Sequence, residues 1–179
     1  MRVIAGTLKG RRIEAPSWPG LRPTSDKLRE TLFNILAARV AGTRVLDACA
    51  GTGAVGIEAI SRGAAHVTFV DRDRRAVDLI ARNLARCGVV EGYTLFRADL
   101  GSQTDGLRHA ADFDFIFLDP PYDTDSALLA RAVRDRLAAG GLLVIEYARR
   151  AGSPADVEGL RRTREVTSGD SALGFYEKT

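Results

Sequence analysis

Three glycines in the stretch DACAGTGAVG, residues 47–56, have a spacing suited to binding a nucleotide-bearing ligand. Gly51, Gly53 and Gly56 form a Gly-x-Gly-x-x-Gly pattern. Glycines in such a loop permit a tight turn and a close approach of the backbone to the ligand. The pattern is typical of nicotinamide-dinucleotide sites, but the glycines alone do not distinguish a dinucleotide from another cofactor that carries adenosine.

The residue that precedes this loop narrows the choice of cofactor. Asp47 follows the apolar run RVL, so we expect it at the carboxyl end of a strand, where open α/β sheets bind their ligands. In a dinucleotide site the next helix receives a pyrophosphate, and a carboxylate would then lie beside an anion. S-adenosylmethionine has no phosphate, and its ammonium and sulfonium groups attract a carboxylate. Asp47 therefore favours S-adenosylmethionine.

Two further aspartates end apolar runs downstream. Asp71 ends HVTFVD, twenty residues after Gly51, and can accept both ribose hydroxyls of either cofactor. Asp99 follows YTLFRA and can accept the adenine amino group, with Leu100 against the ring. Each of these aspartates also suits a helix N-cap. Three carboxylates at the ends of three consecutive strands, however, fit one ligand that spans them.

A second chemical motif stands in FIFLDPPYD. Asp119, Pro120, Pro121 and Tyr122 follow an apolar run, and the prolines fix the backbone dihedrals of the turn. The Asp119 carboxylate and the Pro120 carbonyl can accept the two hydrogens of an exocyclic base amine, which aims the nitrogen lone pair at an electrophilic methyl group. Tyr122 can stack on the base. This is the Asp/Asn-Pro-Pro-Tyr/Phe pattern of amino-group methyltransferases.

Other chemistries fit the sequence less well. Methylation at C5 of a pyrimidine requires a nucleophilic cysteine in the crevice, and no cysteine follows this motif. Cys49 reads as a small buried residue, and Cys87 stands far from it, so we expect a reduced chain without a disulfide or a metal site. His66 and His109 are expected at a strand start and in a loop.

The surrounding elements alternate between strands and helices from residue 44 onward. Strands are expected at 44–49, 66–71, 93–99, 113–119 and 142–147, with helices at 54–63, 74–88, 102–110 and 125–137, the last closed by Gly140 and Gly141. The runs 160–169 and 171–179 have no helix between them and predict an antiparallel pair at one edge. The fold class is therefore α/β, a seven-stranded Rossmann-like sheet that resembles the fold of the class I S-adenosylmethionine-dependent methyltransferases.

The N-terminal part differs in charge from the rest. Residues 1–29 hold seven Lys/Arg and two Asp/Glu, whereas residues 30–148 hold thirteen and sixteen. We expect residues 1–23 to form a basic β-hairpin extension around Lys9 and Gly10 that contacts a polyanion, followed by the catalytic domain, 24–179, which opens with a helix capped by Thr24 or Ser25. The sequence contains no apolar run that could span a bilayer and no signal core, so a cytoplasmic protein is expected.

The whole chain resembles the bacterial small-subunit ribosomal RNA guanine-N2 methyltransferases. The resemblance rests on RVIAGTLKGRRI, RPTSDKLRETLFNIL, LDACAGTGAVGIEAISRGA, LDPPY and GDSALGFYEK. It implies methylation of one guanine of 16S ribosomal RNA by S-adenosylmethionine on the assembling 30S subunit, by a monomer. It also implies that residues 22–34 pack over the cofactor and line the active site.

The resemblance completes two sets of expected site residues. The cofactor-binding set is Thr24, Asp47, Ala48, Gly51, Gly53, Asp71, Arg72, Asp99, Leu100 and Asp119. The set for RNA or substrate is Lys9, Arg11, Arg12, Arg22, Arg29 and Asn34. Two alternatives remain open: a DNA adenine-N6 methyltransferase, which shares the Asp-Pro-Pro-Tyr motif, and a non-catalytic RNA-binding assembly factor.

Overall fold

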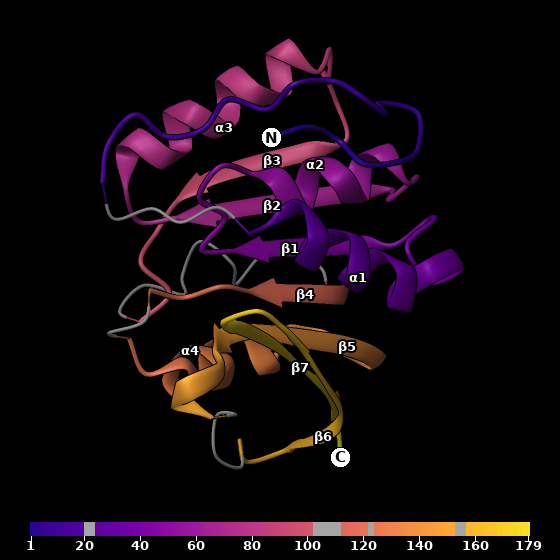
Figure 1. The fold of residues 1–179 in the computed structure, drawn as a ribbon. Coiled ribbons are helices and arrows are strands. Elements are labelled where there is room, and N and C mark those ends of the chain that lie inside the picture. The colour runs from indigo at the N-terminus through magenta and orange to yellow at the C-terminus, as the bar shows by residue number, and fades with distance from the viewer. Residues whose placement is uncertain (20–23, 102–111, 122–123, 153–156) are drawn as a thin grey trace.

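A seven-stranded sheet organises the described residues of the computed structural model, which are 1–19, 24–101, 112–121, 124–152 and 157–179. The strand order is β3-β2-β1-β4-β5-β7-β6 (Figure 1). The first five strands in this order run parallel, and β7 is antiparallel to both β5 and β6. The strands are β1 Arg44–Ala48, β2 His66–Asp71, β3 Tyr93–Arg97, β4 Phe113–Leu118, β5 Leu137–Ala148, β6 Leu160–Ser168 and β7 Ser171–Lys178. The predicted sheet and its antiparallel edge are thus confirmed.

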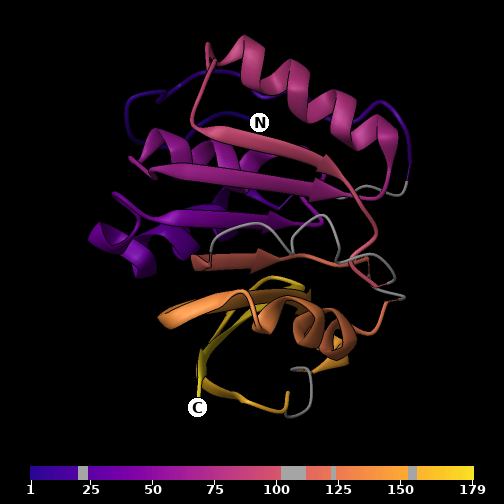
Figure 2. The ribbon, with the colours of Figure 1, turned by 180° about the vertical axis from the view of Figure 1, so that it is seen from behind.

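Helices cover both faces of this sheet. The α-helices are α1 Asp26–Leu36, α2 Ala54–Ser61, α3 Arg74–Arg86 and α4 Ser126–Arg134, and short 3-10 turns cover Ala37–Arg39 and Arg149–Ala151. Helices α1, α2 and α3 share one apolar cluster with one face of the sheet, and α4 packs in a second cluster on the other face (Figures 1 and 2). No helix within the described ranges has the length and apolar character needed to cross a bilayer.

The central strands are apolar because they are buried on both faces. In β1, Val45 belongs to the first cluster and Leu46 to the second. In β4, Phe117 and Leu118 divide in the same way. Successive side chains of a strand point to opposite faces, so a parallel strand between two helical layers shows no polar alternation.

Helix boundaries follow the expected capping chemistry with one exception. Ser25, not Thr24, is the N-cap of α1, and its side chain accepts a hydrogen bond from the Leu28 N–H. The expected helix at 125–137 ends early, at Arg134. The prediction that Gly140 and Gly141 close it was wrong, because β5 already pairs with β4 from residue 137 and the glycines lie where the register shifts. The helix expected at 102–110 and His109 lie outside the described residues.

The N-terminal segment folds back on itself as a short hairpin. A single antiparallel bridge joins Arg2 to Arg12, and the Val3 N–H donates to the Arg11 carbonyl at 2.9 Å. This confirms the antiparallel pairing, although within the described residues 1–19 the pairing is limited to this one bridge. Val3 and Ile13 are buried in the first apolar cluster. The proposed boundary at residue 23 lies outside the described part.

A buried carboxylate fixes this hairpin to α2. Glu58 is fully buried and accepts hydrogen bonds from the Ile4 and Ala5 N–H groups at 2.7 and 3.0 Å. It also pairs with Arg62 at 2.8 Å and lies 4.0 Å from the Arg29 guanidinium. A buried charge is tolerated only when it is paired and hydrogen-bonded, so Glu58 makes the N-terminal hairpin an integral part of the fold.

Replacing Glu58 by glutamine should loosen the hairpin. Removing one charge of a buried pair costs about 3 kcal/mol of unfolding free energy, which lowers the melting temperature by about 6–12 °C in a chain of this size. Calorimetry measures the loss, and limited trypsin digestion should cut sooner after Lys9. The matched control is Glu30→Gln on the exposed side of α1. Equal melting temperatures for the two variants would contradict the anchoring role.

Candidate active site

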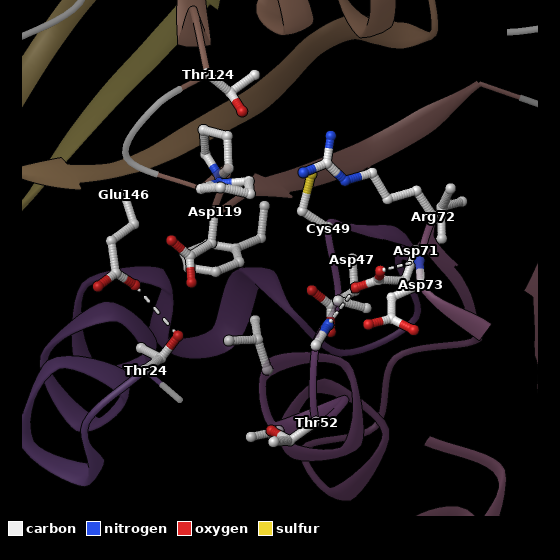
Figure 3. Close-up of a pocket in the computed structure, with 18 of the residues that line it drawn as sticks. Thr24, Asp47, Cys49, Thr52, Asp71, Arg72, Asp73, Asp119, Thr124 and Glu146 are labelled. Carbon is white, nitrogen blue, oxygen red and sulfur yellow. Dashed lines mark hydrogen bonds between the residues drawn. The ribbon is translucent and has the colours of Figure 1, made fainter. Parts of the chain in front are cut away.

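A cavity of about 1050 Å³ opens at the carboxyl ends of the central strands. Four acidic side chains reach it from neighbouring strands: Asp71 at the end of β2, Asp47 in β1, Asp119 after β4 and Glu146 in β5. Figure 3 shows Glu146 and Asp119 at one end of this cavity and Asp71 at the other, with Asp47 between them. This left-to-right arrangement follows the strand order of the sheet. The two chemical motifs of the sequence therefore face one shared space.

The glycine loop takes backbone conformations that favour glycine. Gly51 and Gly53 have φ values of 56° and 75°, in the left-handed region, and Cys49 also lies there at 59°. At Gly56 a Cβ atom would lie 2.2 Å from the Phe69 ring, so only glycine lets α2 pack this closely on β2. The loop is thus built for tight turning and close packing.

Asp47 links this loop to the start of α2. Its side chain is 2% exposed and accepts a hydrogen bond from the Gly56 N–H at 2.8 Å. Burial raises the pKa of Asp47 to about 8, although that hydrogen bond acts in the opposite direction. A carboxylate held in this way gains from a cation in the cavity.

Asp71 serves the glycine loop and does not cap the next helix. Its two oxygens accept hydrogen bonds from the Gly51 and Asp73 N–H groups, each at 2.9 Å. The cap of α3 is Asp73, whose side chain accepts from the Arg75 N–H. The alternative reading of Asp71 as an N-cap was therefore wrong, and its carboxylate lies on the cavity wall. Burial raises its pKa.

The Asp-Pro-Pro corner closes the opposite end of the cavity. Asp119 and Pro120 follow β4, and the Asp119 N–H donates to the Ala48 carbonyl of β1 at 3.3 Å. Glu146 of β5 is 6% exposed and accepts a hydrogen bond from the Thr24 hydroxyl at 3.1 Å. Pro121 also lines the cavity, whereas Tyr122 lies outside the described residues.

Buried acidic side chains are concentrated at this end. Burial raises the pKa of Asp119 well above its ordinary range, and the neighbouring Glu146 and Asp47 carboxylates raise it further. Burial also raises the pKa of Glu146, against the opposing hydrogen bonds from Ser171 and Thr24. Groups of like charge whose pKa values are raised together in a cleft are a common feature of functional sites.

Cys49 is on the cavity wall but is not activated. Burial and the carboxylates of Asp71, Asp119 and Asp47 raise the pKa of its thiol, and Arg72 opposes them. A thiol held protonated is a poor nucleophile. The Cys49 side chain is only half-buried, so the expectation of a buried residue was wrong. In the part of the chain that the structure describes, no three His, Cys, Asp or Glu side chains gather in a way that could hold a metal ion.

Some of the remaining cofactor candidates line the cavity, and others lie behind the residues that do. Arg72, Asp99 and Leu100 line the cavity, with Asp99 exposed and Leu100 buried. Ala48 contributes its carbonyl to the Asp119 corner. Gly53 stands behind the loop as the N-cap of α2.

The described candidates for RNA contact lie on two elements, the N-terminal hairpin and α1. Lys9, Arg11 and Arg12 are exposed on the N-terminal hairpin. Asn34 is exposed on α1 but does not line the cavity. Arg22 lies outside the described residues.

The assignment of Arg29 to substrate binding needs correction. This side chain is fully buried, and its guanidinium donates to the Arg2 carbonyl at 2.6 Å and to Asp26 at 3.0 Å. It is not part of the cavity wall. Its charge neighbours Glu58 instead, so Arg29 holds the N-terminal hairpin in place.

Sequence reasoning missed several residues of the site. Glu146 was detectable as a lone acid inside the apolar run LLVIEY, because a buried strand carries a charge only for a reason. Trp18 and the turn between β6 and β7, residues 168–171, also line the cavity. No local sequence pattern marks these residues, because they are distant in sequence from both motifs and only the folded sheet brings them to the cavity.

Comparison with known proteins agrees with this geometry. The family described as Conserved hypothetical protein 95 matches residues 1–177. The chain is 37% identical to "Putative rRNA methyltransferase YlbH" of Bacillus subtilis, across 99% of both proteins. It is 33% identical to "Ribosomal RNA small subunit methyltransferase D" of Escherichia coli, across 99% of this chain and 90% of that protein.

A solved structure shows the same architecture. "Putative methyltransferase yhhF" from Escherichia coli superposes with a TM-score of 0.85 at 28% identity, across 99% of this chain and 97% of the other. The sheet order and the antiparallel edge hairpin are those of the class I methyltransferases. With its fold, its glycine loop and its full-length relatives in agreement, the chain belongs to the Conserved hypothetical protein 95 family, as a relative of the bacterial ribosomal RNA small subunit methyltransferases D.

Proposed function

We propose that this protein methylates the exocyclic N2 amine of one guanine in 16S ribosomal RNA, with S-adenosylmethionine as cofactor. The observation that carries the proposal is the shared cavity, which has the glycine loop at Asp47 on one side and the Asp119-Pro120 corner on the other. The names of the relatives support ribosomal RNA of the small subunit as the substrate. The choice of guanine N2 comes from the family resemblance.

The chemistry of the cavity fits this cofactor. Asp47, Asp71, Asp119 and Glu146 leave the wall rich in carboxylates, an environment that repels pyrophosphate and attracts an ammonium or sulfonium group. Asp71, at the end of β2, suits the ribose hydroxyls, and Asp99 with Leu100 suits the adenine. When bound, S-adenosylmethionine supplies an electrophilic methyl group.

The residues at the opposite end are suited to activating an amine. The nitrogen lone pair of guanine N2 is delocalised into the ring, so the free amine is a weak nucleophile. Hydrogen bonds from its two hydrogens to the Asp119 carboxylate and the Pro120 carbonyl hold the nitrogen in a reactive orientation. Asp119, backed by Glu146, then accepts the proton that the nitrogen loses. Tyr122 remains our candidate for stacking on the base.

The exposed basic hairpin supports an RNA partner. Lys9, Arg11 and Arg12 suit the phosphate backbone of the 30S particle. We propose that the protein acts as a monomer in the cytoplasm, where the subunit assembles.

Radiolabelled cofactor tests the function and the role of Asp119 together. The wild-type protein should transfer the label to 16S RNA when the substrate is 30S particles from cells that lack the activity. Digestion of that RNA should release labelled N2-methylguanosine. Asp119→Ala should lower the rate at least about 100-fold, because it removes an acceptor that acts in the transition state, and should still bind the cofactor. The matched control is Asp112→Ala, an exposed residue just before β4.

Two outcomes would contradict this reading. Label on adenine of DNA would favour a DNA adenine-N6 methyltransferase. Full complementation of the cellular role by the Asp119→Ala variant would favour a non-catalytic assembly factor.

Cofactor affinity should rise with pH. The pKa of Asp47 is about 8 in the free protein, and a bound cation favours the carboxylate, so binding below that pH releases protons. Affinity for S-adenosylmethionine should increase by about tenfold or more between pH 6 and 8 and then level off. S-adenosylhomocysteine, which lacks the sulfonium charge, should show a smaller rise.

Calorimetry in two buffers of different ionisation enthalpy counts the released protons. Asp47→Asn keeps an acceptor for the Gly56 N–H but cannot ionise, so its affinity should depend less on pH. A wild-type affinity that is flat from pH 6 to 8 would refute the electrostatic account.

Charge reversal on the hairpin should weaken RNA binding in a salt-dependent way. The double variant Arg11→Glu with Arg12→Glu removes two cationic contacts. The negative slope of log affinity against log salt concentration should therefore become shallower by about 1 to 2. The control reverses two exposed arginines of the edge strand β6, Arg161 and Arg164. If both double variants keep the wild-type slope, the hairpin is not the RNA contact.

A further inference from the structure

Trp18 is the single tryptophan of the chain, and it forms part of the cavity wall. The side chain is half-buried and neighbours Pro19, which also lines the cavity. Tryptophan is enriched at interfaces, where part of the ring is buried and part is open to a partner. Like Thr24 and Ser25, it lines the cavity although it stands far in sequence from the glycine loop and the strand ends.

A chain of polar contacts fixes the indole relative to the glycine loop. The Arg75 guanidinium lies 5.1 Å from the centroid of the Trp18 ring, within the range of a cation–π interaction. The same guanidinium makes a bidentate contact with Asp73, through its Nε at 3.0 Å and its NH2 at 2.6 Å. The Asp73 N–H in turn donates to Asp71.

This chain places the indole at one particular end of the cavity. Asp71 and Asp73 stand at the end of β2, the side suited to a ribose. The amine end, with Asp119 and Glu146, belongs to β4 and β5, two and three strands away in the order of the sheet. An indole at the β2 side is therefore placed for the nucleoside of the cofactor, not for the target base.

We propose that Trp18, held by Arg75, binds the adenosine half of the cofactor by covering it with one face of the indole. This inference rests on the proposed use of S-adenosylmethionine and adds a binding residue outside the glycine loop and the strand ends. Arg75 occupies one face of the ring, and a flat nucleoside suits the other. Stacking between an aromatic side chain and a base is strong and tolerant of geometry. Arg75 acts as a positioning residue because it contacts the indole.

The single tryptophan makes the test direct. S-adenosylhomocysteine titrated into the wild-type protein should quench the intrinsic fluorescence with a saturable curve, because the adenine stacks on the only indole. Calorimetry should show that Trp18→Ala weakens S-adenosylhomocysteine binding about tenfold or more. Trp18→Phe should stay within a few-fold of the wild type, because a smaller aromatic face remains.

Arg74, in the same helix turn, provides a matched control for Arg75. Arg75→Gln should weaken binding less than Trp18→Ala and should also reduce the quenching, since the indole loses its support. Arg74→Gln changes an exposed neighbour that pairs with Asp78 at 3.8 Å, and it should leave both readouts unchanged. Melting temperatures of all variants show that the fold is intact.

The outcomes separate this inference from the proposed function. If the wild type binds S-adenosylhomocysteine and Trp18→Ala binds it equally well, the inference is wrong and the function stands. If that variant keeps cofactor affinity but loses affinity for 30S particles, the indole contacts RNA and the inference is again wrong. If the wild type binds neither S-adenosylmethionine nor S-adenosylhomocysteine, both proposals fail.

Discussion

The burial of acidic side chains at the carboxyl ends of the parallel strands is the constraint on which the site depends. Four adjacent parallel strands, β2, β1, β4 and β5, bring Asp71, Asp47, Asp119 and Glu146 to a single cavity. Desolvation raises the pKa of all four carboxyl groups. Such an arrangement costs folding free energy unless protons or a cation neutralise it. A cationic cofactor turns this cost into affinity, which is why the same residues can weaken the fold and define the ligand.

Helix α2 supports this end of the sheet. Glycine at position 56 lets α2 pack against β2 closely enough for its N–H to reach Asp47. Glu58, two residues further along α2, holds the N-terminal hairpin. One short helix therefore connects the cofactor loop on one side with the basic hairpin on the other. The basic hairpin and the glycine loop share this helix, and neither is a loosely attached tail.

Local patterns in the sequence were sufficient for most of the fold. The apolar runs predicted β1, β2 and β4 closely because strands buried on both faces need apolar side chains throughout. The antiparallel edge was predictable because no crossover helix separates its two strands. The end of α4 was not predictable, because Gly140 and Gly141 look like a helix stop, and only the pairing of β5 with β4 shows that they belong to a strand irregularity.

The site was predictable where motif and strand end coincide. Asp47, Asp71 and Asp119 each close an apolar run, and the structure brings them together. Arg29 was misassigned because the family resemblance placed its segment along the active site, whereas a buried partner at Glu58 becomes visible only in three dimensions. Trp18 joins the wall through Arg75, a contact between residues fifty-seven positions apart in the sequence. Contacts of this kind leave no local signal.

A crystal structure with S-adenosylhomocysteine bound tests the central claim most directly. The account predicts the ribose at Asp71, the amino-acid half beside Asp47, and the sulfur turned toward the Asp119-Pro120 corner across the cavity. A ligand bound elsewhere, or one whose sulfur points away from that corner, would contradict it.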